Sequence, residues 1–107
     1  MQGIENMYQV AMARKKEPME GSYTNYLFDK GLEKILKKLG EENTEVIIAA
    51  MQGSKEELIG EINDYLYHLV VMMAEKGITP EEVDAVMLKR ESKTGNLKPE
   101  RKEIKQL

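Results

Sequence analysis

Two capping signals divide the middle of the chain into two long helical segments. Ser22 is a suitable N-cap for a helical stretch over residues 23–51, and a glycine soon after that stretch ends it. Ser54 with Glu57 three residues later forms a capping box, which opens a second segment over residues 55–76. Because a connection as short as "QGS" separates the segments, we expect the two helices to pack as an antiparallel pair.

Glycines and prolines mark the shorter elements around this pair. Gly31 and Gly40 each cost about 1 kcal/mol relative to alanine inside a helix, so we expect a bend or break near Gly31. Before the pair, apolar side chains at helical spacing predict a helix over residues 4–14, and the polar run at residues 15–21 predicts a loop. After the pair, the motif "TPEE" opens a further helix over residues 80–93.

The composition favours helices and excludes several classes of protein. Aromatic residues make up 6% of the chain, and good helix formers dominate it, so we predict an all-α fold, a small helical bundle with two long antiparallel central helices. There is no cysteine, which excludes a disulfide framework, a thiol nucleophile and a cysteine-based zinc site. No apolar run reaches the roughly 18 residues of a membrane span and no signal-peptide pattern is present, so we expect a cytoplasmic protein.

Length and charge bound the organisation of the chain. The 107 residues make one domain, which we place at residues 1–93, followed by a charged tail at residues 94–107 that we expect to be flexible. From Lys89 onward the net charge is +4, so the body before it carries −7 within a total of −3. An acidic body argues against nucleic-acid binding. Because so short a chain buries little surface, we expect a homodimer or a larger homo-oligomer to complete the bundle.

Three glutamates stand directly before an apolar run that looks like core. At roughly 100° per residue, Glu41, Glu42 and Glu45 lie inside the arc of apolar side chains and not opposite it. That arc contains Ile35, Val46, Ile48 and Ala49. An ordinary amphipathic helix would turn its charges toward water, so this arrangement indicates a special role for the carboxylates.

The second long segment repeats the anomaly. Acidic residues and one histidine at intervals of four, three and four form one stripe: Glu57, Glu61, Asp64 and His68. In an antiparallel pair this stripe would face the three glutamates. A solvated acidic face is the alternative, but two facing clusters favour a metal site, since carboxylates without cysteine suit a hard cation such as Mg²⁺ or Mn²⁺.

Basic residues near these carboxylates suit a phosphorylated substrate. Lys34, Lys37 and Lys38 lie within two turns of Glu41, and we place Arg14, Lys15 and Lys16 in the preceding loop. Mg²⁺ in proteins usually keeps open positions and shares oxygens with substrate phosphates. Although any single lysine could be an ordinary surface residue, the whole set leads us to predict metal-dependent phosphate chemistry.

The acidic residues also match a known pattern. The spacing Glu41-Glu42-x-x-Glu45 followed by Glu61-x-x-Asp64 resembles the metal signature of the all-α nucleoside triphosphate pyrophosphatases, the MazG-like superfamily. The surrounding text, "GSYTNYLFDKGLEKILKKLGEENTEVIIAA" and "ELIGEINDYLYHLVVMMAEKGI", resembles the phosphoribosyl-ATP pyrophosphohydrolase family of histidine biosynthesis. This resemblance covers the chain from about residue 4 to residue 90.

The resemblance implies a reaction and assigns residues to it. It implies hydrolysis of phosphoribosyl-ATP between its α and β phosphates, Mg²⁺ dependence and a homodimer. By position, the metal ligands would be Glu42, Glu45, Glu61 and Asp64. Glu41 would be a further ligand or the base for the attacking water, so that Glu41, Glu42 and Glu45 would form the catalytic set. The predicted small-molecule substrate would then be phosphoribosyl-ATP.

The substrate contacts are predicted from position. Ser22, Tyr23 and Thr24 begin a helix, where hydroxyls and backbone N–H groups suit a phosphate or ribose, although Ser22 could equally serve as a cap alone. To these we add Arg14, Lys34, Lys38 and His68. A lone helical histidine is more often structural, so a substrate contact for His68 is the less favoured alternative. Tyr67 falls off the acidic face, and we expect it to pack in the core or at a dimer contact.

Two alternatives remain open at this point. A house-cleaning pyrophosphatase of the same fold would share the metal site and act on ordinary or damaged nucleotides. A non-enzymatic helical dimerisation module would use its acids to pair with lysines. Turnover of phosphoribosyl-ATP against common nucleotides distinguishes the first alternative, and an absence of any metal effect on stability would indicate the second.

Overall fold

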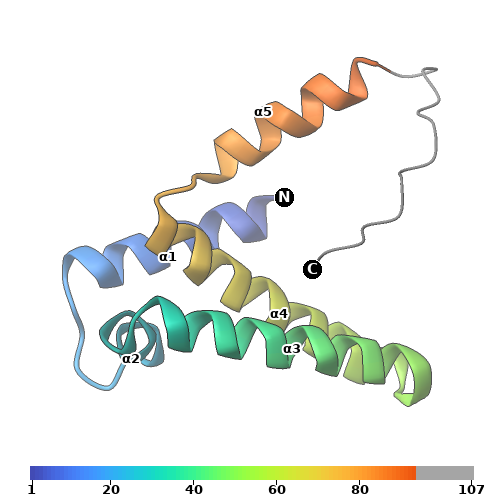
Figure 1. Ribbon diagram of the computed structural model, residues 1–107, viewed down its shortest axis with the longest axis horizontal. Coiled ribbons are helices and arrows are strands. Elements are labelled where there is room, and N and C mark those ends of the chain that lie inside the picture. Colours follow the sequence, from blue (N-terminus) through green and yellow to red (C-terminus); the bar gives the residue numbers. More distant parts are fainter. Residues whose placement is uncertain (94–107) are drawn as a thin grey trace, which may run out of the picture.

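The computed structural model describes residues 1–93, and all the regular secondary structure in that range is helical (Figure 1). Its helices are α1 (Gln2–Lys16), α2 (Tyr23–Lys30), α3 (Leu32–Gln52), α4 (Lys55–Lys76) and α5 (Pro80–Glu91). The predicted all-α fold is therefore confirmed. The predicted charged tail lies outside the described residues. Within these, no helix combines the length and the apolar character that a membrane crossing requires.

Helices α3 and α4 run antiparallel along each other and form the long centre of the molecule (Figure 1). The predicted capping box is present: the Ser54 side chain accepts a hydrogen bond from the Glu57 N–H, and the Glu57 side chain accepts one from the Ser54 N–H. Gly53 ends α3 in a tight turn, where a Cβ would lie 2.9 Å from the Ala49 carbonyl oxygen. This turn has no room for a larger residue without a shift, so it fixes the alignment of the two helices.

The predicted break near Gly31 is confirmed. Gly31 has a φ of +91°, a value that residues with a side chain rarely adopt, and it separates α2 from α3. At the other end of α2, the Ser22 hydroxyl accepts a hydrogen bond from the Asn25 N–H at 3.2 Å, as predicted for an N-cap. The long segment predicted over residues 23–51 therefore consists of two helices that point in different directions.

Helix α1 is longer than predicted, and this corrects the position of three basic residues. Arg14, Lys15 and Lys16 form its last turn and do not lie in a loop. Positive side chains are favourable at this end of a helix because they face the exposed carbonyl groups. Lys15 also binds α4, where its Nζ lies 3.1 Å from Glu75 Oε1 and 3.3 Å from the Ala74 carbonyl oxygen. At the other end of the chain, α5 stops at Glu91, two residues before the predicted end.

The core consists of two groups of buried side chains that share α4. The first group joins α1 to α4: Tyr8, Ala11, Val70, Met73 and Ala74. The second group joins α2 and α3 to α4: Leu27, Ile35 and Val71. Tyr67 packs against the second group, as predicted. Helix α4 is thus the element around which α1, α2 and α3 assemble.

The apolar run at residues 46–50 does not form core in the single chain, contrary to our expectation. Ala49 is buried, but Ile47 and Ile48 are 53% and 47% exposed. Helix α4 covers only one side of the apolar arc of α3, and Ile35, Glu42 and Ala49 are buried on that side. In Figure 1, α5 extends away from the α3–α4 pair and does not cover the remaining face of α3.

Candidate active site

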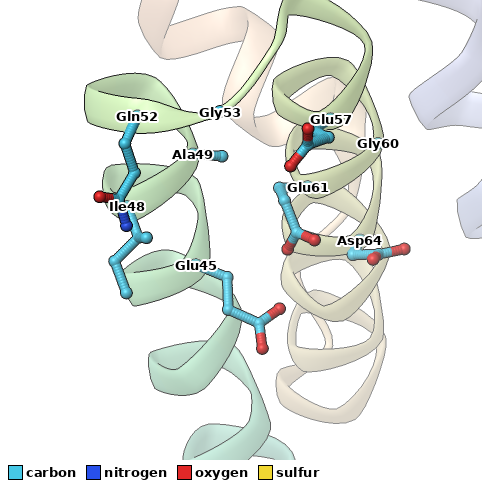
Figure 2. A pocket seen from close by; sticks show the side chains of 9 residues that line it. All are labelled: Glu45, Ile48, Ala49, Gln52, Gly53, Glu57, Gly60, Glu61 and Asp64. Atoms are coloured by element: carbon cyan, nitrogen blue, oxygen red, sulfur yellow. The ribbon is translucent and has the colours of Figure 1, made fainter.

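Three carboxylates from α3 and α4 meet at the seam between the two helices. One oxygen from each of Glu42, Glu45 and Glu61 can be chosen so that all three lie within 4.8 Å of one another. Figure 2 shows the Glu45 side chain extending from α3, and that of Glu61 from α4, toward the space between the helices. We call these three residues the carboxylate cluster. The predicted convergence of the two acidic stripes is therefore present.

A pocket of about 690 Å³ opens beside the carboxylate cluster (Figure 2). Its lining comes from the facing sides of α3 and α4 and from the turn between them: Glu45, Ile48, Ala49, Gln52, Gly53, Glu57, Gly60, Glu61 and Asp64. Asp64, predicted as a fourth ligand, lines this pocket next to the cluster. Gln52 was not predicted, although it lies two helical turns after Glu45 and so occupies the same face of α3.

Glu42 occupies the least accessible position of the cluster. Glu42 is 8% exposed and lies on the buried side of α3, together with Ile35 and Ala49. Glu42 Oε2 and Glu61 Oε2 are both inaccessible to water, and neither has a hydrogen-bond partner. Buried carboxylate oxygens without partners are costly. A hard divalent cation, which prefers oxygen ligands, fits this donor set and would supply the missing partner.

The electrostatics of the carboxylate cluster favour an added positive charge. The pKa of Glu61 is raised to about 7, first by a hydrogen bond with Glu45, then by burial and by the charges of Glu45, Asp64 and Glu42. Burial raises the pKa of Glu42 as well, followed by its hydrogen bond with Glu45 and the Glu45 and Asp64 charges. Mutual repulsion therefore makes the cluster hold a proton near neutral pH. A bound cation could supply the same positive charge.

The raised pKa of Glu61 predicts that the metal-free protein loses stability as the pH rises. Because the pKa of Glu61 is about 7 in the folded protein and 4.5 in an ordinary glutamate, the folded protein binds more protons than the unfolded chain in this range. The free energy of unfolding should therefore decrease between about pH 5 and pH 8. Chemical denaturation in the presence of EDTA measures this slope.

Two matched substitutions check that assignment. Glu61→Gln should flatten the pH dependence, because an amide does not titrate. Glu20→Gln changes an exposed glutamate between α1 and α2 and should leave the slope unchanged. A slope that survives intact in Glu61→Gln would show that another group is responsible.

Glu41 lies outside the carboxylate cluster, on the exposed side of α3. Its Oε2 accepts a hydrogen bond from Lys38 Nζ at 3.4 Å. Burial raises the pKa of the Tyr23 hydroxyl, as it does that of Glu42, and the Lys38 charge partly opposes the rise in both groups. Lys34 is half-buried one turn before Lys38. The structure therefore brings Lys38, Glu41 and Tyr23 to one end of the cluster.

The predicted residues of α2 all take part in hydrogen bonds. Besides the Ser22 cap, the Thr24 hydroxyl is hydrogen-bonded to the Tyr67 hydroxyl, and Thr24 is buried. The Tyr23 hydroxyl lies 3.1 Å from Nε2 of His68. Tyr23 is 45% exposed, whereas His68 is 5% exposed, so the histidine is enclosed by the protein and the tyrosine is not.

Arg14 lies in a different part of the structure from the carboxylate pocket. It lines a cleft of about 350 Å³ at the end of α1, together with Lys16 and Met19. Asn25 Nδ2 donates a hydrogen bond to the Arg14 carbonyl oxygen at 2.7 Å, which joins this cleft to α2. Of the predicted basic contacts, Lys38 is therefore close to the carboxylates, and Arg14 is linked to them through α2.

Known proteins resemble this chain over nearly its whole length. The family model described as phosphoribosyl-ATP pyrophosphohydrolase matches residues 4–91. A phosphoribosyl-ATP pyrophosphatase of Streptococcus thermophilus is 54% identical over 101 residues, covering 94% of this chain and 96% of the relative. One of Clostridium novyi is 51% identical over 97% of this chain and 94% of its own. One of Limosilactobacillus fermentum is 51% identical over the full length of both chains.

Proposed function

We propose that this chain, which belongs to the phosphoribosyl-ATP pyrophosphohydrolase family as its motifs predict, catalyses the family's reaction at the carboxylate cluster. It is a hydrolase that acts on phosphoribosyl-ATP in histidine biosynthesis. The observation that carries the assignment of the site is the meeting of Glu42, Glu45 and Glu61, with two buried oxygens that lack partners. We expect the reaction to take place in the cytoplasm.

Glu42, Glu45 and Glu61 would hold a divalent cation, with Asp64 beside them as a fourth ligand. Mg²⁺ is the proposed ion and Mn²⁺ an acceptable substitute, because both prefer oxygen ligands. When bound, such an ion supplies positive charge to the phosphoryl oxygens and to the pyrophosphate leaving group. The support for this proposal is the fit between the charge of the cluster and the charge of the ion.

The reaction adds water across one anhydride bond of the substrate. The oxygen of water bonds to the α phosphorus, the bond from that phosphorus to the bridging oxygen breaks, and phosphoribosyl-AMP and pyrophosphate leave. Glu41, an exposed carboxylate next to the cluster, is the proposed acceptor of the proton from the water. Lys38 Nζ holds Glu41 at 3.4 Å and provides a positive charge for a substrate phosphate.

We also propose that the substrate extends from the cluster toward α2. The charges of Lys38 and Glu42 both act on the Tyr23 hydroxyl, so a molecule bound at the carboxylate cluster would contact Tyr23. Ser22 and Thr24 flank Tyr23, Lys34 lies on the Lys38 side of α3, and Arg14 is joined to α2 through Asn25. His68 is buried, so it would act on the substrate through Tyr23 and would not contact the substrate itself.

The two earlier alternatives do not explain the findings equally well. The family match and the named relatives make the chain an enzyme, so the non-enzymatic module is wrong. A general nucleotide pyrophosphatase would share the carboxylates, but the matched family is the one that acts on phosphoribosyl-ATP. Turnover of dATP and dCTP should accordingly be far slower than turnover of phosphoribosyl-ATP.

Removal of metal tests the proposal directly. Protein treated with EDTA should release no pyrophosphate from phosphoribosyl-ATP, and added Mg²⁺ or Mn²⁺ should restore release. The ion should also stabilise the fold, by about 2.7 kcal/mol at a concentration of 100 times its Kd. Pyrophosphate release and thermal melting, measured on the same samples, check both effects. Full activity in EDTA would contradict a metal site at the cluster.

We further propose that the protein is a homodimer formed through the outer faces of α3 and α4. Exposed apolar side chains gather on these two helices: Ile47, Ile48, Met51, Ile59 and Ile62. A second copy would bury them, and because Ile48 lines the carboxylate pocket, the interface would lie next to the active site.

A matched pair of substitutions tests this interface. Ile47→Glu should convert the dimer to a monomer, because it places a charge in the apolar face. Val10 on α1 is also 53% exposed, and Val10→Glu should leave the assembly unchanged. Sedimentation velocity measures the mass of each variant. A monomeric wild-type protein, or a dimer that survives Ile47→Glu, would contradict the proposed interface.

A further inference from the structure

A chain of hydrogen bonds connects α4 to α2 behind the active site. His68 Nδ1 lies 2.7 Å from the Asp64 carbonyl oxygen, one turn earlier on α4. On the other side of the ring, His68 Nε2 lies 3.1 Å from the Tyr23 hydroxyl. His68 is the one histidine in the sequence, and it is 5% exposed. Both ring nitrogens are therefore used inside the protein.

The partners of His68 decide which nitrogen carries the proton. A carbonyl oxygen is an acceptor without a proton of its own, so Nδ1 must donate to Asp64. A neutral imidazole has one donor and one acceptor, and Nε2 is then the acceptor. With the ring neutral, Tyr23 therefore donates its hydroxyl proton to Nε2. The direction of the whole chain follows from a single backbone carbonyl group.

Aromatic packing holds these groups in place. The Tyr67 ring meets the His68 ring edge-on with centroids 5.0 Å apart, and the Tyr23 ring meets it edge-on at 5.8 Å. Tyr23 also stacks on Tyr67, at 6.1 Å, and on Tyr26, at 5.8 Å. Edge-on and offset arrangements of this kind are favourable for aromatic pairs. Rotation of the imidazole would therefore disturb several contacts at once.

The Tyr23 hydroxyl retains the capacity to accept a hydrogen bond. Tyr23 is 45% exposed, and the charges of Lys38 and Glu42 both act on its hydroxyl group. A phosphate oxygen at neutral pH is mainly an acceptor and needs a donor. A sugar hydroxyl or an ammonium group can donate to the Tyr23 oxygen.

We propose that His68 is a positioning residue of the active site: it directs the Tyr23 hydroxyl proton inward, so that Tyr23 accepts a hydrogen bond from a ribose hydroxyl of the substrate and does not bind a phosphate. The identity of the substrate rests on the proposed function, whereas the proton arrangement of His68 and Tyr23 does not. Of the two contacts that the sequence allows for Tyr23, a phosphate or a ribose, Tyr23 therefore binds the ribose.

Nitrogen NMR of the single histidine tests the first half without any activity measurement. In ¹⁵N-histidine-labelled protein, Nδ1 should resonate as a protonated nitrogen and Nε2 as an unprotonated nitrogen that accepts a hydrogen bond. Tyr23→Phe should shift the Nε2 resonance toward that of a free acceptor and leave Nδ1 protonated. Tyr26→Phe is the matched control, because Tyr26 is 41% exposed and stacks on Tyr23, while the hydrogen bond to His68 Nε2 comes from Tyr23. A proton on Nε2, or equal shifts in both variants, would overturn the proposal.

Kinetics of Tyr23→Phe test the second half. Loss of one hydrogen bond should raise KM for phosphoribosyl-ATP about 2- to 10-fold, with a smaller change in kcat. Inhibition by pyrophosphate, which has phosphates but no ribose, should be unchanged. If pyrophosphate inhibition weakens as much as substrate binding does, Tyr23 contacts a phosphate and the proposal is wrong. If no variant or wild-type sample turns over substrate, the proposed function fails, and the NMR result stands on its own.

His68→Asn separates the two bonds of the histidine. Asn63 already donates from Nδ2 to the Ile59 carbonyl oxygen at 3.0 Å, four residues earlier on the same helix. An asparagine at position 68 can make the same bond to Asp64 but is too short to reach Tyr23. It should raise KM as Tyr23→Phe does, and the double variant should show no further increase. Additive effects would mean that His68 and Tyr23 act independently. His68→Gln serves as a second variant if the first does not fold.

Discussion

Glu45→Gln should abolish pyrophosphate release from phosphoribosyl-ATP, with a loss of more than about 100-fold in kcat/KM. Both other members of the carboxylate cluster interact with Glu45: burial and then Glu45 raise the pKa of Glu42, and Glu45 is the main cause of the raised pKa of Glu61. The substitution keeps the size of the side chain but removes its charge and one oxygen ligand. Residues that merely support metal ligands cost about 10- to 100-fold when they are lost, so a ligand itself should cost more.

The position of Glu45 makes this result easy to interpret. Glu45 is exposed and lies outside both buried groups of the core, so the variant should fold. When metal is absent, its melting temperature should equal or exceed that of the wild-type protein, because one repelling charge is removed from the cluster. Its melting temperature should rise less on addition of Mg²⁺. Glu20→Gln, in the exposed connection between α1 and α2, serves as the control and should retain full activity. Normal turnover by Glu45→Gln would remove the cluster from the mechanism.

Leu27→Ala should lower the free energy of unfolding by about 2–5 kcal/mol. Leu27 is 0% exposed and packs with Ile35 and Val71, so it joins α2 to both central helices. The smaller side chain would leave a cavity at this junction. Because α2 also carries Tyr23 and Thr24, loosening of α2 should raise KM as well as destabilise the protein.

A leucine in a different environment provides the comparison. Leu88 on α5 is 65% exposed, and Leu88→Ala should change the free energy of unfolding by less than about 0.5 kcal/mol. Urea denaturation of both variants, monitored by circular dichroism, measures the difference. Similar values for the two substitutions would show that the junction of α2, α3 and α4 does not carry the stability assigned to it.

Local signals predicted the helices well because each signal is a local interaction. The capping boxes at Ser54 and Thr79 bind backbone groups within the same turn, so their effect does not depend on the rest of the fold. The same holds for the break at Gly31. The end of α1 was missed because Arg14, Lys15 and Lys16 look polar in sequence, whereas the contact from Lys15 to α4 that supports the last turn comes from the tertiary fold.

The carboxylate cluster was predicted in outline, and its burial was not. Helical spacing gives the angle of each side chain around the axis, and this was enough to bring the α3 and α4 stripes together. Helical spacing does not show which side of α3 packs against α4, and so does not give the line of contact between the two helices. That line buries Glu42 and leaves Glu41 and Ile48 exposed, so the ranking of the carboxylates needed the structure. The link from His68 to Tyr23 joins residues that are 45 positions apart, and no local pattern indicates it.

The tight turn at Gly53 has a consequence for how the protein folds. Glu45 and Glu61 each lie eight positions from Gly53, and Glu42 and Asp64 each lie eleven positions from it, so the turn pairs them across the hairpin. All four carboxylates thus belong to a single local hairpin. Contacts with short sequence separation form quickly because little chain entropy is lost in closing the loop. The carboxylate part of the active site should therefore assemble early on the folding pathway, before α1 and α2 dock on α4.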